Sequence, residues 1–303
     1  MNGHGAHFWH IHHQMMARYH LERLSNDLGP IKELDYFYEH IETPYKPSIS
    51  HFNGLEFPDR SEHLYITARH HNYELIKMVR NLERRILDAI DTGYVMSIHP
   101  GSFMNLYSSE GYNLLGELIE GTGRSINPRY YGSFHMAAKK LLGDAPFYRN
   151  IEEYAPSVLE MSMTAIRDPV FWQLYQKIME FFHFYSLALP PYQYNDIIME
   201  GVKIDKVEVS ELKTLFEDFE VNINNHFSFM PNTPQSESIL TAHVNRLNHQ
   251  PWKYAIHVDS EKYYKNSVVR AFIGPKFDYD GTVVDINEDR HLFFEIDQFA
   301  YDR

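Results

Sequence analysis

Residues 7–26 of the chain read HFWHIHHQMMARYHLERLSN, and this stretch decides the fold. Within it Phe8, Ile11, Met15 and Tyr19 recur at intervals of three and four residues, the spacing of one face of an α-helix. Histidines crowd the beginning of this stretch and the residues just before it, at His4, His7, His10, His12 and His13. We therefore expect a helix with one apolar stripe and a histidine-rich remainder.

The residues that follow carry more helix signals up to about residue 191. We expect helices from Asn72 to Gly93, over residues 114–119 and 131–142, and from Asp168 to Pro190. The start of the last helix is the best defined. A carboxylate at Asp168 can accept a bond from a free backbone N–H, and Pro169 has no N–H to leave unpaired in the first turn.

The pattern changes near Gly201, where helix periodicity weakens and β-branched and aromatic residues alternate with polar ones. Strands are expected over residues 239–246, 252–258, 267–273 and 292–299, with a turn at Asp280-Gly281. Strands without intervening helices predict an antiparallel β-sandwich. The predicted fold class is therefore α+β and multidomain, with a helical domain over residues 1–205 and a β domain over residues 206–303.

Composition excludes several classes of function. The net charge of −13 argues against binding to nucleic acid or anionic membranes, and no apolar run is long enough to insert into a membrane. The absence of cysteine removes disulfides, thiolate catalysis and cysteine metal sites. No signal peptide is visible in this sequence. The chain contains 22 Tyr, 20 Phe and 19 His, an aromatic excess that makes amino-acid content itself a candidate function.

The histidines allow two interpretations. His135 lies on a second predicted helix, and imidazoles on facing helices are one way in which a bundle holds a metal. The alternative, a polar and partly exposed helix edge, is favoured by the residues of the first helix alone. Dinucleotide-binding, P-loop and nucleophile-elbow motifs do not occur.

Residues 12–26, HHQMMARYHLERLSN, resemble the arthropod hemocyanin superfamily, which comprises hemocyanins, prophenoloxidases and insect hexamerins. The resemblance continues in the same order through residues 84–90, 130–135, 159–172, 191–204, 272–276 and 292–297. It implies the central helical domain of that superfamily, lacking its first part, followed by the beginning of its Ig-like β-sandwich. Members are considerably longer, so the resemblance also implies that the chain is a fragment.

The same resemblance locates the copper ligands. His12 falls at the last ligand of the first copper, and His135 at the first ligand of the second copper. The two further ligands of the second copper should be histidines but are Lys139 and Tyr175. A protonated amine and a protonated phenol offer no imidazole-like lone pair at neutral pH. We therefore expect no bound metal, no cofactor, no catalytic residue and no enzymatic activity.

Loss of copper ligands together with abundant Tyr and Phe is similar to hexamerins of the arylphorin type. The resemblance implies an amino-acid storage protein of the haemolymph, a hexamer of like subunits that is later held in storage granules after uptake by a receptor on the fat body. Two alternatives stay open: a copper-dependent oxygen carrier or phenoloxidase, and a carrier of small hydrophobic ligands such as juvenile hormone. We also expect the chain alone to aggregate, through an exposed face bearing Phe8, Ile11 and Met15.

Overall fold

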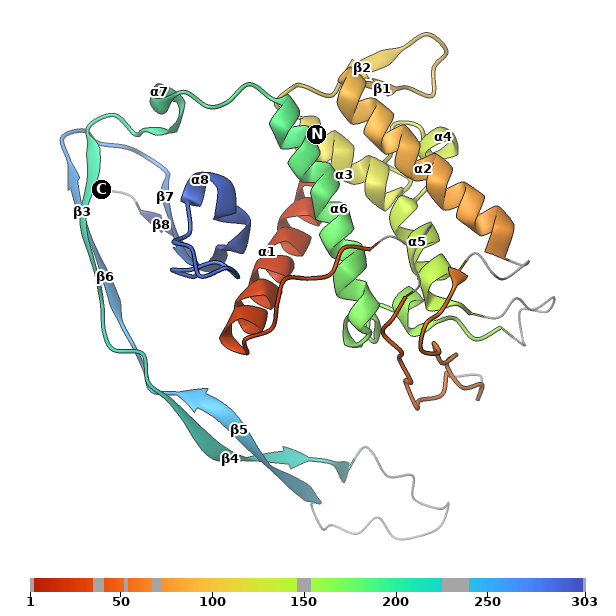
Figure 1. Cartoon of the computed structure of the whole chain (residues 1–303). Helices are drawn as coiled ribbons and strands as arrows, with labels where there is room; N and C mark the ends of the chain where they lie inside the picture. The colour runs from red at the N-terminus through yellow and green to blue at the C-terminus, as the bar shows by residue number, and fades with distance from the viewer. Residues whose placement is uncertain are drawn as a thin grey trace. The chain divides into compact units, whose positions relative to one another are not determined.

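A computed structural model describes residues 3–34, 41–51, 54–66, 72–145, 154–224 and 240–301 (Figure 1). The chain forms two compact units. The first comprises Met1–Pro191 and Val268–Ala300, and the second comprises Tyr192–Ser267 and Tyr301–Arg303. The domain boundary expected near residue 205 stays a prediction.

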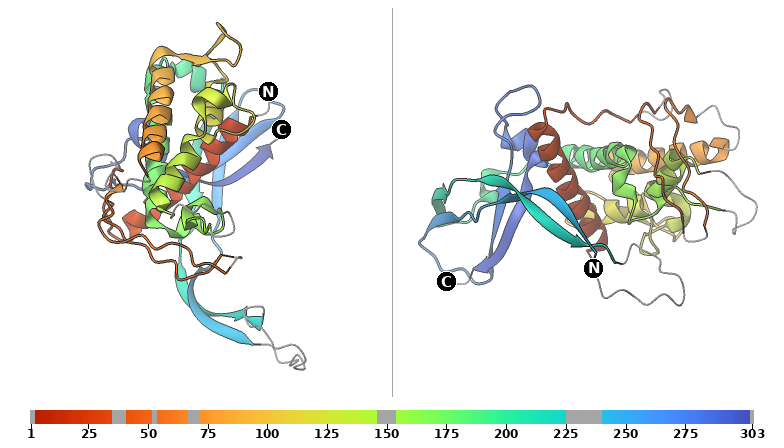
Figure 2. Two further views of the ribbon diagram at one scale, coloured as in Figure 1. Left: turned by 90° about the vertical axis from the view of Figure 1, so that its right-hand side faces the viewer. Right: turned by 90° about the horizontal axis from the view of Figure 1, so that it is seen from below.

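The first unit is a helical bundle. Its helices are α1 (His4–Ser25), α2 (Tyr73–Thr92), α3 (Gly111–Glu120), α4 (Pro128–Tyr131), α5 (Phe134–Gly143) and α6 (Pro169–Ala188). Helix α1 packs on α3 and α6, and α2 packs on α5 and α6 (Figure 2). The antiparallel pair β1 (Tyr94–Met96) and β2 (Phe103–Asn105) and the 3₁₀ turns η4 (Val158–Glu160) and η5 (Ala165–Arg167) complete the part of the bundle before residue 191.

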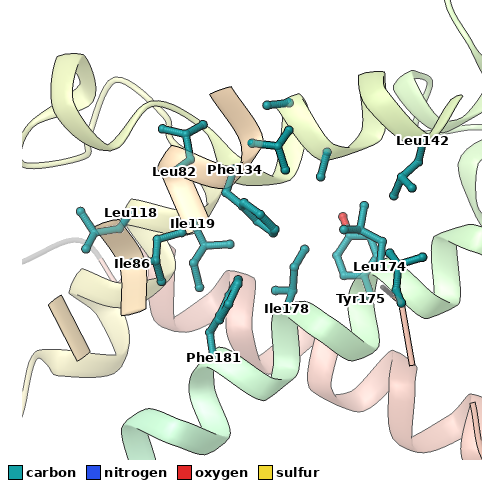
Figure 3. Packing of buried hydrophobic residues seen from close by; sticks show 14 of the residues in the cluster. Leu82, Ile86, Leu118, Ile119, Phe134, Leu142, Leu174, Tyr175, Ile178 and Phe181 are labelled. Atoms are coloured by element: carbon teal, nitrogen blue, oxygen red, sulfur yellow. The ribbon is translucent and has the colours of Figure 1, made fainter. Parts of the chain in front are cut away.

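Aliphatic and aromatic side chains of α1, α2, α3, α5 and α6 contribute to the bundle core. Figure 3 shows Phe134, Ile119 and Ile178 meeting in its middle, with Leu142 and Tyr175 at one end. These residues are almost completely shielded from solvent. The buried hydroxyl of Tyr185 finds a partner in this core, because it donates to the carbonyl oxygen of Leu106 at 2.9 Å.

Helix α1 forms where the apolar spacing predicts it, but part of the expected stripe was wrong. Phe8 is buried, whereas Ile11 is 46% exposed. The buried face runs instead along Gly5, Phe8, Met16, Ala17 and His20. The orientation of this face follows from a close approach of α1 to α3. There, Oδ1 of Asn113 accepts a hydrogen bond from the Gly5 N–H at 2.9 Å. Small residues therefore help to decide which face of α1 points inward. The spacing of large apolar residues in the sequence does not reveal them.

The other helix predictions are confirmed, with changed ends. Oδ1 of Asp168 accepts the Val170 N–H at 3.0 Å, as expected of a helix cap. The helix predicted over residues 131–142 is divided, because Gly132 has a φ of 56° and separates α4 from α5. The hydroxyl of Ser133 then caps α5 by accepting the Met136 N–H at 3.2 Å.

The second unit contains the short helix α7 (Tyr194–Ile197) and strands β3 (Val202–Val209), β4 (Thr214–Asn222), β5 (Thr241–His249) and β6 (Tyr254–Ser260). Strands β3 and β6 pair antiparallel with a register shift after Ile204, and β4 and β5 pair antiparallel in continuous register. The predicted strand start at residue 239 lies outside the described residues. Strands β3 and β4 had no range of their own in the sequence prediction.

Residues 268–300 belong to the helical unit. Strands β7 (Ser267–Ile273) and β8 (Phe294–Tyr301) pair with each other, and α8 (Ile286–Asp289) and the 3₁₀ turn η7 (Arg290–Leu292) lie between them. Turn η7 packs on α1 and buries Leu292. The predicted strand start at Leu292 was therefore wrong, because this side chain anchors a turn on the bundle.

Candidate functional site

The four positions singled out in the sequence meet inside the bundle. Helix α1 contributes His12, α5 contributes His135 and Lys139, and α6 contributes Tyr175. The Tyr175 ring stacks on the His12 ring, with centroids 4.4 Å apart and planes 12° from parallel. The His135 ring meets Tyr175 edge-on at 5.9 Å, and the Lys139 Nζ lies 5.4 Å from the Tyr175 ring centroid.

Helix geometry explains this convergence. His135 and Lys139 are four residues apart on α5 and therefore lie on one face. The same spacing joins Phe171 to Tyr175 on α6, whose rings lie 4.4 Å apart. The cap at Asp168 fixes where α6 begins and hence which of its side chains point toward α5.

His12 is a neutral imidazole with a fixed orientation. Its Nδ1–H donates to the carbonyl oxygen of Phe8 at 2.7 Å, which leaves the lone pair on Nε2. Burial lowers the pKa of His12 to about 4; the bond to Phe8 opposes this shift and the charge of Lys139 adds to it. The ring is therefore uncharged at neutral pH.

His135 is also neutral. Burial lowers its pKa to about 3, and the nearby Lys139 and His12 contribute in the same direction. Its Nδ1 is buried and has no hydrogen-bond partner among the described residues. A buried imidazole nitrogen without a partner is one feature of a metal-binding position, so the other side chains of the set decide whether a metal could bind here.

Lys139 forms no ion pair within the described residues. It lies instead over two aromatic rings, with Nζ 5.6 Å from the Phe171 centroid and slightly closer to Tyr175. Burial lowers the pKa of Lys139 to about 8. The amine is consequently still mostly protonated at neutral pH, where it offers no lone pair.

Tyr175 is the most enclosed of the four, with 1% of its surface exposed. Burial raises the pKa of its phenol, and the negative charge of Glu120 raises it further. The phenol therefore keeps its proton throughout the physiological range.

This donor set does not fit the second copper ion. The second copper position keeps the imidazole of His135, but its two other positions hold a cation, Lys139, and a neutral phenol, Tyr175. A cationic amine repels a metal cation, and its proton must be removed before it can coordinate. In addition, the described residues contain no group of three or more His, Asp or Glu side chains that could hold a metal ion.

Sequence reasoning missed two residues that shape this site. Phe8 contacts the rings of both His12, at 4.3 Å, and His135, at 5.8 Å, and Phe171 covers Lys139. Both had been assigned to apolar helix faces only. Their four-residue spacing from His12 and Tyr175 was the available signal.

Within the described helices, none is long and apolar enough to cross a membrane.

Known protein families match this chain over nearly its whole length. The family model described as "Hemocyanin, copper containing domain" matches residues 1–182, and the model described as "Hemocyanin, ig-like domain" matches residues 191–302. Hexamerin 70b of Apis mellifera is 36% identical over 297 residues, covering 98% of this chain and 43% of the relative. A hexamerin of Blaberus discoidalis is 33% identical, covering 98% of this chain and 46% of the relative.

Among solved structures, a hemolymph type prophenoloxidase from a crustacean superposes with a TM-score of 0.85 at 26% identity, covering 99% of this chain and 49% of the other. The chain thus spans less than half the length of each of these proteins. The resemblance expected from residues 12–26 is confirmed, as is the α+β fold class of a helical part followed by an Ig-like part. The chain belongs to the hemocyanin superfamily.

Proposed function

We propose that this chain serves in an amino-acid storage protein of the hexamerin type, without functional copper and without enzymatic activity. The observation that carries the proposal is the filling of the copper region by Tyr175, which stacks on His12 at 4.4 Å and lies under the ammonium of Lys139. Hexamerins are among the relatives, which supports the same class.

Composition supports the storage role. The 22 Tyr and 20 Phe residues make the chain a concentrated reserve of aromatic amino acids for building and tanning cuticle. With this role we propose a hexamer of like subunits in the haemolymph, taken up through a fat-body receptor into storage granules. Within the described residues, no feature favours the alternative of a carrier for small hydrophobic molecules.

Copper reconstitution tests the metal part of the proposal. The full-length protein is incubated with Cu(I) under anaerobic conditions, desalted and measured for copper by mass spectrometry. We expect well below one copper per chain and no oxidation of catechols. Two coppers per chain, or a catechol oxidase activity that depends on them, would support the oxygen carrier or phenoloxidase instead.

A double variant provides the matched control. Lys139→His with Tyr175→His returns imidazoles to the two altered positions beside His135. We expect this variant to retain more copper than the unmodified protein after the same desalting, because neutral imidazole is a copper ligand and ammonium is not. Equal retention would mean that these two positions do not decide binding.

An isotope experiment tests storage directly. The protein is labelled with heavy tyrosine and returned to the haemolymph of the animal that makes it, and the label is then followed into newly made cuticle. Transfer of label as the intact protein disappears is the expected result. Persistence of the intact protein while cuticle forms unlabelled would contradict the storage role.

A further inference from the structure

The antiparallel hairpin of β1 and β2 has one buried face and one exposed face. It follows α2 and projects from one end of the bundle (Figure 1). Val95 is completely buried, whereas its neighbours Tyr94 and Met96 are 57% and 38% exposed. Phe103, the cross-strand partner of Met96, is 57% exposed. Successive side chains of a strand point to opposite faces, so Tyr94, Met96 and Phe103 share the outer face.

A fourth large apolar side chain extends this exposed surface. Ile98, which follows the end of β1, is 61% exposed. We call Tyr94, Met96, Ile98 and Phe103 the hairpin patch. Single exposed apolar residues are ordinary on a folded protein. The hairpin patch, however, exposes on the order of 500 Å², the size at which an apolar surface indicates an interaction site.

Hydrogen bonds hold the backbone of the hairpin in place. The Ser97 N–H donates to the carbonyl oxygen of Ser102 at 2.9 Å, and the Asn127 side chain donates to the carbonyl oxygen of Ser97 at 3.2 Å. The Met96 N–H donates to the hydroxyl of Tyr131 on α4 at 3.0 Å. A partner therefore meets side chains on a backbone that is already ordered, which reduces the entropic cost of association.

The hairpin carries no fixed charge. Residues 93–109 contain no Asp, Glu, Lys or Arg, although these residues make up 23% of the chain. Because the net charge is −13, two copies of the chain repel each other, and this repulsion is weakest where both surfaces are uncharged. Aromatic residues and Met in place of charged residues are typical of the core of a protein interface. The hairpin patch therefore fits another apolar face and lacks the cations that would bind an acidic partner.

We propose that the hairpin patch is a contact between two copies of this chain, which meet patch to patch about a two-fold axis near Met96 and Phe103. In this arrangement apolar side chains meet apolar side chains, and no charge is buried without a partner. Two such patches bury about 1,000 Å² in total, the lower limit for a specific interface. The contact specifies how like subunits meet, and it rests on the proposed function only for the larger assembly.

Distances between spin labels on the whole chain test the contact. The chain contains no cysteine, so Ser102→Cys in the turn of the hairpin supplies a single labelling position near the proposed axis. Ser61→Cys supplies an exposed control position beside Arg60, which pairs with Asp168 at the opposite end of α6 from the hairpin. Because α6 spans about 30 Å, we expect a narrow distance distribution for Ser102→Cys and a distance at least twice as long for Ser61→Cys.

Charged substitutions connect the short distance to the hairpin patch. In the labelled Ser102→Cys protein, Phe103→Lys places a charge at the centre of the patch and should reduce the short-distance population at least tenfold. Met163→Lys, at a position that is 86% exposed and lies outside the patch, is the matched control and should leave this population unchanged. If Phe103→Lys fails to fold, Ile98→Lys, beyond the end of β1, tests the same surface.

The possible outcomes separate this contact from the proposed function. A monomeric chain, or a short distance that persists in both Phe103→Lys and Ile98→Lys, overturns the contact. An assembled protein in which the labels at position 102 lie no closer than those at position 61 also overturns it, but leaves assembly from like subunits as proposed. The storage role is tested separately, by the transfer of labelled tyrosine.

Discussion

The single residue Lys139 illustrates how the altered copper region lowers the stability of the folded protein. Its ammonium is buried, has no carboxylate beside it in the described structure and is held only by two rings. We expect Lys139→Met to stabilise the protein at pH 7 by about 1–3 kcal/mol, because a long apolar side chain fills the same space without a charge. Chemical denaturation measures the difference. Lys140→Met, at the exposed neighbouring position, should change stability by no more than about 0.5 kcal/mol.

The stability gained by Lys139→Met should depend on pH in a definite direction. Below pH 8 Lys139 is charged in both the folded and the unfolded protein, so the cost of burying the charge is present in full. Between pH 8 and 10.5 the unfolded protein holds a proton that the folded protein has lost, and stability of the unmodified protein relative to Lys139→Met rises with pH. A stability gap that stays constant up to pH 10 would show that burial of the charge is not its cause.

Asp168 performs two tasks with one carboxylate. It caps α6 at Val170 and forms a buried bidentate pair with Arg60, with Nη1–Oδ2 and Nη2–Oδ1 distances of 2.7 and 2.5 Å. We expect Asp168→Ala to lower the free energy of unfolding by about 3–5 kcal/mol, because it leaves a buried guanidinium without a counter-charge. Asp59→Ala, which removes the exposed partner of Lys46, should cost less than about 1 kcal/mol. Similar losses in the two variants would contradict this account.

At the scale of elements, the crossing of α1 and α3 depends on two glycines. A Cβ on Gly116 would lie 2.1 Å from the carbonyl oxygen of Gly5, and this neighbour is backbone that cannot move aside. We expect Gly116→Ala to destabilise the bundle by about 1–3 kcal/mol or more. Gly123→Ala adds a Cβ with nothing within 4 Å and should be close to neutral. Thermal melts of the two variants provide the comparison.

The crossing of α1 and α3 also shows how much of the fold could be predicted from the sequence. Apolar spacing was sufficient for α2 and α6, whose large aliphatic and aromatic residues mark a single buried face. On α1 the contact with α3 is made by Gly5, so spacing of large residues identified the helix but placed Ile11 on the wrong side. The copper-region residues were found by resemblance, but their mutual stacking depends on packing between three helices.

At the scale of the whole molecule, the paired strands of the second unit expose large apolar side chains. Phe216 is 69% exposed and its cross-strand neighbour Leu247 is 60% exposed, and Ile204 on β3 is 62% exposed. Contiguous apolar surface on paired strands favours association. Because Phe8 is buried, we expect the aggregation of the chain alone to arise from these strands rather than from the face predicted on α1.

We expect the chain expressed alone to self-associate and Phe216→Lys to shift it toward the monomer, as measured by sedimentation velocity. Thr214→Lys introduces the same charge at an exposed polar position of the same strand and should have a smaller effect. A monodisperse monomer for the unmodified chain would refute this expectation.

Burial in the bundle also decides when its aromatic residues can be recovered. Tyr175, Tyr185, Phe134 and Phe181 have at most 2% of their surface exposed. A protease needs an extended segment in its cleft, so it cannot cut beside these residues until the helices separate. Digestion of the bundle should accordingly proceed molecule by molecule, with intact chains and small peptides coexisting and few partly trimmed cores between them. The rate of tyrosine release would then follow the opening equilibrium of the bundle rather than the number of cleavable bonds.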